Sequence, residues 1–314
     1  MNDEPKKHKD RSDALIHRSA FRVPRFHSSP PPILFAFGAA LLWSTGGLFI
    51  KATTLSALEL SFGRSVLAAL TVAWFTRREG FGLNLVTGAA ALMYAALLLL
   101  FVMATKLTTA ANAIFLQYTA PVYIMFFEPL LYREKFRVRD LGVVVACVAG
   151  MSLFFVGKLR PQDVEGNLTA LASGLCFACF TLLLRHRAAR RVNRASSVIY
   201  GNLLLALVAA PFFFGDGLSK MSPKEASIML FLGVVQIGLA YTLFTLSIAR
   251  GVRSLDAGVV GYIEPVLNPV WVFVFIGERP SGWAVAGGLI IVAAVVAHMV
   301  LRAKLTEPSP PGLS

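Results

Sequence analysis

Charged residues are scarce in this chain of 314 residues. They make up 15% of it, whereas hydrophobic residues make up 56%. A soluble domain carries about 25% charged residues, because its surface must face water. The shortage of charge therefore excludes a soluble globular protein and predicts an integral membrane protein.

Acidic residues are the scarcer of the two charge types, with 17 Asp and Glu against 30 Lys and Arg and a formal net charge of +13. In a soluble protein this excess would suggest binding to nucleic acid. Here the basic residues lie between long apolar runs, where they orient a membrane protein. We therefore expect membrane lipid, and not nucleic acid, around this chain.

Metal-binding and catalytic motifs are also missing. Cys147, Cys176 and Cys179 lie inside apolar runs, with no histidine near enough in sequence to complete a metal motif. The chain has no phosphate-binding loop, no His-Glu-x-x-His and no Gly-x-Ser-x-Gly. We expect no cofactor, no metal and no enzymatic activity. A channel or a receptor stays open, although no stretch resembles a selectivity filter.

Long apolar runs make up most of what is present. A bilayer is crossed by about 20 apolar residues in a helix. The fold class predicted is therefore an all-α integral membrane protein with ten transmembrane helices. The ten runs are 33–51, 57–75, 85–104, 110–131, 140–157, 167–185, 196–214, 226–249, 257–276 and 282–301.

The two halves of the chain repeat one another. At an offset of 144, Tyr118 aligns with Tyr262 and Pro121 with Pro265. Five spans per repeat is an odd number, so the repeats must cross the membrane in opposite directions. Inverted repeats place a binding site near the midplane and permit alternating access. The predicted divisions are a disordered basic tail 1–32, a first five-helix repeat 33–157, an external loop 158–166, a second repeat 167–301 and a tail 302–314.

The distribution of Lys and Arg predicts the topology. Loops on the side of the N-terminus hold 22 of these residues, and those on the other side hold 7. By the positive-inside rule both termini are expected in the cytoplasm, with the protein in the cell (inner) membrane. Arg64 is the basic residue inside a span, where we expect it to snorkel or to bond to backbone carbonyls in a structural role.

Glu264 and Pro265 interrupt the ninth span. A carboxylate at this depth costs about 2.5 to 3.5 kcal/mol on insertion scales, so it needs a partner. One hypothesis is that Glu264 binds a substrate ammonium group or a proton. The alternative is a fixed structural group, held by a neighbouring Arg, Ser or backbone amide. Pro121 and Pro265 are candidate hinges for access switching, or else static kinks.

Polar and aromatic side chains share the same spans, which predicts a cavity for an amphiphilic small molecule. Aromatic residues at bilayer interfaces are the alternative for each ring taken singly. The candidate cavity residues are Trp43, Ser44, Tyr94, Gln117, Tyr118, Gln236, Tyr241, Tyr262, Glu264 and Asn268.

Two acids lie just beyond helix ends, where the negative end of the helix dipole disfavours them. We hypothesise two gate ion pairs between the repeats. The alternative is that each acid orients the next helix. The pairs are Glu134 with Arg250 or Arg185, and Glu278 with Lys106 or Lys51.

Several short motifs together resemble the drug/metabolite transporter superfamily, in particular its EamA-type ten-helix members, over residues 33–301. The start of the first span also resembles a branch of amino-acid exporters. The motifs are Leu42-Trp43-Ser44-Thr45 with Lys51, Arg64, Glu134-Lys135, Glu264-Pro265-Val266-Leu267-Asn268-Pro269 and Gly277-Glu278-Arg279-Pro280.

The resemblance implies a secondary transporter that exports amino acids or similar small metabolites by alternating access. A proton-coupled antiporter of another metabolite or drug class is the alternative. In the first half Thr119-Ala120-Pro121 lacks the carboxylate of the second half, so the halves are not equivalent. The sequence leaves a monomer and a homodimer both open.

Overall fold

The computed structural model describes residues 30–133, 137–153, 156, 163–276 and 281–306. The chain divides into two units, Met1–Pro31 and Pro32–Ser314, and the second holds all the helices discussed below. All regular secondary structure in these described ranges is helical, as the sequence predicted.

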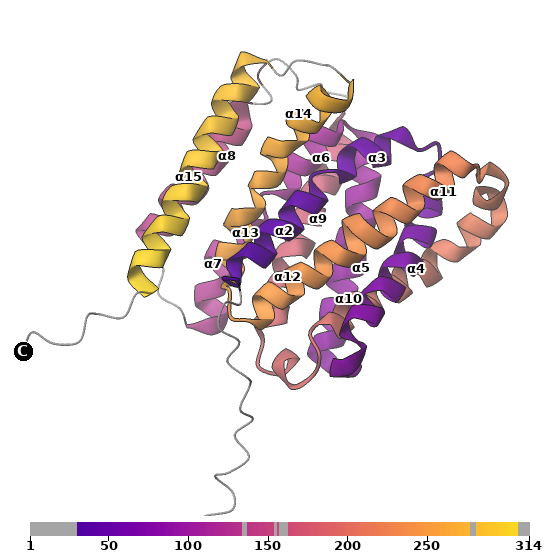
Figure 1. The fold of residues 1–314 in the computed structure, drawn as a ribbon, viewed down its shortest axis with the longest axis horizontal. Helices are drawn as coiled ribbons and strands as arrows, with labels where there is room; N and C mark the ends of the chain where they lie inside the picture. The colour runs from indigo at the N-terminus through magenta and orange to yellow at the C-terminus, as the bar shows by residue number, and fades with distance from the viewer. Residues whose placement is uncertain (1–29, 134–136, 154–155, 157–162, 277–280, 307–314) are drawn as a thin grey trace, which may run out of the picture. The chain divides into compact units, whose positions relative to one another are not determined.

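Figure 1 shows the helices α2 to α15, coloured from indigo to yellow along the chain. The first half contains α2 Ile33–Trp43, α3 Gly46–Ala52, α4 Ala57–Thr76, α5 Leu85–Leu107, α6 Ala110–Gln117, α7 Ala120–Tyr132 and α8 Val138–Leu153. The second half contains α9 Val164–Arg185, α10 Ala195–Phe212, α11 Pro223–Leu230, α12 Ala240–Ala249, α13 Ser254–Gly261, α14 Ile263–Ile276 and α15 Gly282–Thr306. Two π-helices, η4 Phe213–Gly217 and η6 Phe231–Leu239, continue α10 and join α11 to α12.

The predicted membrane spans are present. Nine helical segments within the described residues are long and apolar enough to cross a bilayer. The remaining predicted span, 140–157, corresponds to α8, which has 16 residues. The protein is therefore an all-α integral membrane protein.

Polar side chains mark several helix starts. Ser56 and Glu59 form a reciprocal capping box at the start of α4, with the Ser56 amide donating to Glu59 over 2.7 Å. The side chains of Asn84, Thr109 and Ser222 accept from backbone amides at the starts of α5, α6 and α11. These oxygens satisfy amides that have no partner within the helix.

Three spans are broken in the middle. The first breaks between α2 and α3, the fourth at Tyr118 and Thr119, and the ninth at Tyr262. Pro121 and Pro265 each fall in the first turn after their break, where a missing N–H leaves no hydrogen bond unmade. The prolines therefore lie just after the breaks of the fourth and ninth spans, in the first turn of the helix that follows each break.

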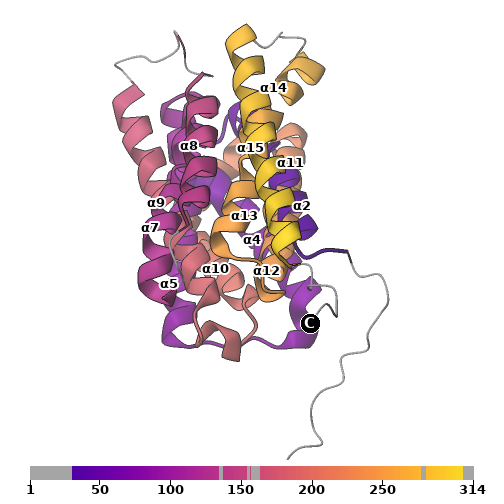
Figure 2. The same ribbon diagram turned by 90° about the vertical axis from the view of Figure 1, so that its left-hand side faces the viewer.

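Packing between the halves comes in matched pairs. The contact of α5 with α9 corresponds to the contact of α12 with α2 when the two halves are exchanged. In the same way, the contact of α5 with α10 corresponds to the contact of η6 with α4. Helix α8 packs on α15, and the two lie together at the side of the bundle (Figure 2). Because successive spans alternate in direction, the first spans of the two halves, α2–α3 and α9, run oppositely.

The close contact of α8 with α15 predicts different effects for two glycines on α8. A Cβ at Gly150 would lie 2.9 Å from the carbonyl oxygen of Gly287, whereas a Cβ at Gly142 would meet nothing within 4 Å. We expect Gly150→Ala to destabilise the protein by about 1 to 3 kcal/mol through overpacking. Gly142→Ala, the matched control, should be neutral or slightly stabilising. Melting temperatures in detergent measure both, and equal values would contradict the packing described.

Candidate functional site

A small pocket with a cavity volume of about 30 Å³ lies where the broken spans meet. Its lining comes from both halves of the chain: α2, α5, the break between α6 and α7, α9, η6, α12 and α14. The lining residues are Trp43, Leu97, Leu98, Phe101, Gln117, Tyr118, Phe177, Gln236, Ile237, Tyr241 and Glu264.

Glu264 is the buried carboxylate of this pocket. It is 4% exposed, and its Oε2 accepts a hydrogen bond of 2.6 Å from the hydroxyl of Tyr118. The breaks in the fourth and ninth spans bring these two residues together. A Cβ at Gly261 would lie 2.9 Å from the Tyr118 ring, so glycine is needed there for the ring to approach. The structure thus supplies a hydroxyl partner and not a cation.

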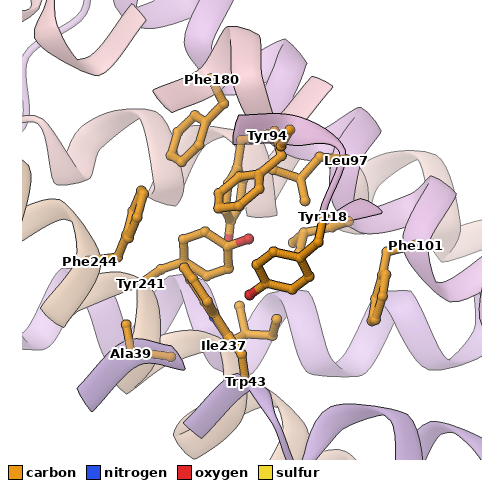
Figure 3. Close-up of a cluster of buried hydrophobic side chains, with 14 of the residues drawn as sticks. Ala39, Trp43, Tyr94, Leu97, Phe101, Tyr118, Phe180, Ile237, Tyr241 and Phe244 are labelled. Atoms are coloured by element: carbon orange, nitrogen blue, oxygen red, sulfur yellow. The ribbon is translucent and has the colours of Figure 1, made fainter. Parts of the chain in front are cut away.

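Aromatic rings form one side of the pocket (Figure 3). The ring of Trp43 lies 4.8 Å from that of Tyr241 and 5.8 Å from that of Phe177. Two buried polar atoms among these residues, Trp43 Nε1 and Gln236 Oε1, have no hydrogen-bond partner among the described residues. The pocket therefore offers a large apolar surface together with a donor and an acceptor for a polar ligand.

Six of the ten predicted cavity residues line the pocket: Trp43, Gln117, Tyr118, Gln236, Tyr241 and Glu264. The other four, Ser44, Tyr94, Tyr262 and Asn268, are not among the lining residues.

Each of these four has a neighbour of its own. Tyr94 packs its ring 4.7 Å from that of Tyr241, and its hydroxyl accepts from Asn202. Ser44 accepts from Trp271 over 2.7 Å. The ring of Tyr262 lies 5.6 Å from that of Tyr118. A Cβ at Gly47 would lie 3.1 Å from Asn268 Nδ2. They support the pocket without lining it in this structure.

The remaining lining residues were not among the predicted ones. Leu97, Leu98, Phe101, Phe177 and Ile237 are apolar, and nothing in the sequence separates them from other residues facing the core or lipid. A partial signal existed for Phe177, because in the first spans of the two repeats the offset is 134, which aligns Phe177 with Trp43 and Arg185 with Lys51.

Four charged residues form an ion-pair cluster at one end of the bundle. This Glu128 cluster consists of Glu128, Asp140, Arg185 and Arg253. Glu128 is 1% exposed, pairs with Arg185, and accepts from Arg253 over 3.0 Å. Arg253 also pairs with Asp140 at 3.2 Å. The acids belong to the first half and the arginines to the second, so the cluster joins the halves.

The charge of Arg253 is stabilised by its neighbours. Burial lowers the pKa of this guanidinium, but Glu128, Asp256 and Asp140 outweigh burial and raise the pKa above its ordinary value. Arg253 therefore remains a cation at every physiological pH, and the cluster does not open through its deprotonation.

The two predicted gate ion pairs stay predictions, because the acid of each pair is not described. Glu134 and Glu278 lie outside the described residues. Arg250 stacks 4.6 Å over the ring of Phe35. At the opposite end, Lys106 Nζ donates to the carbonyl of Thr53 over 2.8 Å and Lys51 Nζ to that of Thr108 over 2.6 Å.

Arg185 does meet an acid, but that acid is Glu128. A signal for Glu128 existed, because it is a carboxylate inside the predicted span 110–131, as Glu264 is inside the ninth.

Removing the charge of Glu128 should be costly. In Glu128→Gln two arginines lose a buried partner, and breaking a buried ion pair destabilises by about 3 to 5 kcal/mol. Glu165→Gln, at an exposed acid in the first turn of α9, is the matched control and should change stability little. Thermal unfolding in detergent compares the two, and similar melting temperatures would show that the cluster does not hold the halves together.

Comparisons with known proteins agree with this architecture. The EamA-like transporter family matches residues 30–156 and 164–299, once in each half. The chain is 26% identical to the pseudopaline exporter CntI of Pseudomonas aeruginosa, over 84% of this chain and 94% of that protein. It is also 26% identical to the aromatic amino acid exporter YddG of Ancylobacter novellus, over 86% of this chain and 97% of that protein.

A solved crystal structure resembles the protein with a TM-score of 0.74 and 21% identity, over 89% of this chain and 100% of that chain. At this identity the likeness shows a shared fold.

Proposed function

Because the chain belongs to the EamA-like transporter family, we propose that it is a secondary transporter that exports amino acids or similar small amphiphilic metabolites. The matching family and the named relatives are transporters and not enzymes. The observation that carries the proposal is the pocket between the halves, where one buried carboxylate faces aromatic rings.

The chemistry of the pocket favours an amphiphilic cation or zwitterion. Glu264 supplies negative charge at membrane depth, and an ammonium group is a suitable counter-ion for it. Trp43, Tyr241 and Phe177 supply apolar contact for a side chain. Two relatives are named exporters of small molecules, one of them of aromatic amino acids, which supports the same class of substrate.

Alternating access provides the mechanism. The Glu128 cluster closes one end of the path by joining the halves, and the helix breaks at Tyr118 and Tyr262 are the points where the halves bend. At the other end Lys51 and Lys106 form no ion pair within the part of the chain that the structure describes. We infer that the Glu128 cluster opens when the pocket faces its side.

The direction of transport follows from the topology. The excess of Lys and Arg lies on the side of the Glu128 cluster, which by the positive-inside rule supports a cytoplasmic position for that side and for both termini. Substrate enters from the cytoplasm when the cluster opens and leaves at the Lys51 and Lys106 end. The protein acts in the inner or plasma membrane, as a monomer or a homodimer.

Proton exchange is the second candidate mechanism, and a specific observation favours it. Glu264 is bonded to a hydroxyl and not to a base, so it can take up a proton without leaving a cation unpaired. Among the described residues, the ionisable side chains that interact with Glu264 are Tyr118 and Tyr241, and the ring of Tyr262 packs against that of Tyr118.

Purified protein in proteoliposomes tests both mechanisms with a panel of labelled amino acids, with and without a pH gradient. We expect saturable movement of at least one amino acid. If the gradient drives that movement and Glu264→Gln abolishes the dependence while Glu165→Gln keeps it, the protein is a proton-coupled antiporter. Movement that ignores the gradient makes it a uniporter in which Glu264 binds substrate alone. If no amino acid moves, the proposed substrate class is wrong.

A further inference from the structure

Arg64 is a cation inside a membrane span, and no acidic residue among those described neutralises its charge. It lies within α4 and is fully buried, with 0% exposure. Its Nη2 donates to the carbonyl of Leu98 at a long 3.3 Å. Its Nε and Nη1 have no partner among the described residues. The hydrogen bond to a backbone carbonyl agrees with the structural role expected from the sequence. It does not account for the other N–H groups of the guanidinium.

A buried guanidinium without an anion is expensive. Unpaired buried charge costs several kcal/mol even after relaxation, and natural proteins compensate it with a counter-ion. No carboxylate of the described chain forms an ion pair with Arg64. A charged residue inside a membrane without such a partner marks a functional site.

The surroundings of Arg64 are polar and incompletely bonded. Ser61 lies three residues before Arg64 on the same face of α4, and Ser65 is the next residue after Arg64. The hydroxyls of both serines also have no partner among the described residues. The packing of η6 is close at this point, because a Cβ at Gly233 would lie 2.8 Å from the Arg64 carbonyl oxygen. This part of the bundle therefore has unfilled hydrogen-bonding capacity.

Arg64 is one layer behind the pocket. The residue whose carbonyl it contacts, Leu98, lines the pocket, and Gln236 of the adjoining η6 lines it as well. A π-helix such as η6 is a locally rearranged helix that often accompanies functional sites. For the unpaired donors of Arg64 to reach a ligand in the pocket, α5 or η6 must shift during the change of access.

We propose that Arg64 is the anion subsite of this pocket and that the transported molecule carries a carboxylate, which Arg64 binds while Glu264 meets the ammonium end. This inference rests on the proposed function and narrows its substrate to a zwitterion. A planar guanidinium suits the binding of a carboxylate, because its N–H groups can donate to both carboxylate oxygens at once. The aromatic rings that line the pocket contact the side chain.

Competition in proteoliposomes tests the proposal. The probes are phenylalanine, phenylalaninamide, which lacks the carboxylate, and N-acetylphenylalanine, which lacks the ammonium group. If another amino acid moves faster, its own amide and N-acetyl derivative replace these probes. We expect wild-type protein to bind the amide about tenfold more weakly than the amino acid. In Arg64→Gln this difference should fall below about twofold, while the penalty for N-acetylation remains.

Two variants complete the design. Ser65→Ala, next to Arg64 on the same helix, should keep the wild-type discrimination. Arg64→Lys keeps the positive charge but lacks the paired N–H donors of the guanidinium, so its discrimination between the amino acid and the amide should be intermediate. This variant tests the proposal if Arg64→Gln does not fold.

The proposal is overturned if wild-type protein treats the amide and the amino acid alike, or if folded Arg64 variants keep the full difference. Either result leaves the proposed export of amino acids intact. If wild-type protein moves no amino acid, the proposed function fails and this inference fails with it.

Discussion

The hydrogen bond between Tyr118 and Glu264 is the interaction on which the arrangement of this protein depends. Inside a bilayer each polar group must be satisfied by the protein itself, and a carboxylate is the most demanding of them. The bond exists because the fourth and ninth spans both break at the level of the pocket, and because Gly261 leaves room for the Tyr118 ring. The irregular backbone thereby lies inside the protein, away from lipid.

The two halves supply a symmetric scaffold for a site that is not symmetric. Counterpart residues meet across the repeats, as Tyr118 meets Tyr262 and Trp43 meets Phe177. Yet the carboxylate belongs to one half alone. The two ends also differ, since Arg185 is paired with Glu128 whereas its counterpart Lys51 bonds to a carbonyl. A transporter built from two equivalent repeats has this property in any one access state, because equivalent elements then form different contacts at its two ends.

The sequence was sufficient for the spans, the breaks in the fourth and ninth spans and the central acid, because each has a local signal: apolar length, proline, and charge within an apolar run. The break between α2 and α3 contains no proline and was not predicted. It was less informative about which residues face the pocket. The rotation of a helix about its axis is decided by packing, so Tyr94 and Tyr262 lie one layer behind Tyr241 and Tyr118. The ion pairs were beyond reach because Glu128 lies 57 residues from Arg185 and 125 from Arg253 along the chain.

The buried charges of Glu264 and Arg64 affect the free energy of the empty pocket in the same way. Glu264 and Arg64 are both buried, and within the described chain neither has an opposite charge as its partner. The empty pocket is therefore electrostatically unfavourable, and the free energy of that state falls when a ligand brings one positive and one negative group. Closing the halves around an empty pocket would leave both buried charges unpaired, whereas closing them around a zwitterion would pair each of them with an opposite charge. The same two residues that recognise a substrate would then also restrict the change of access to the loaded protein.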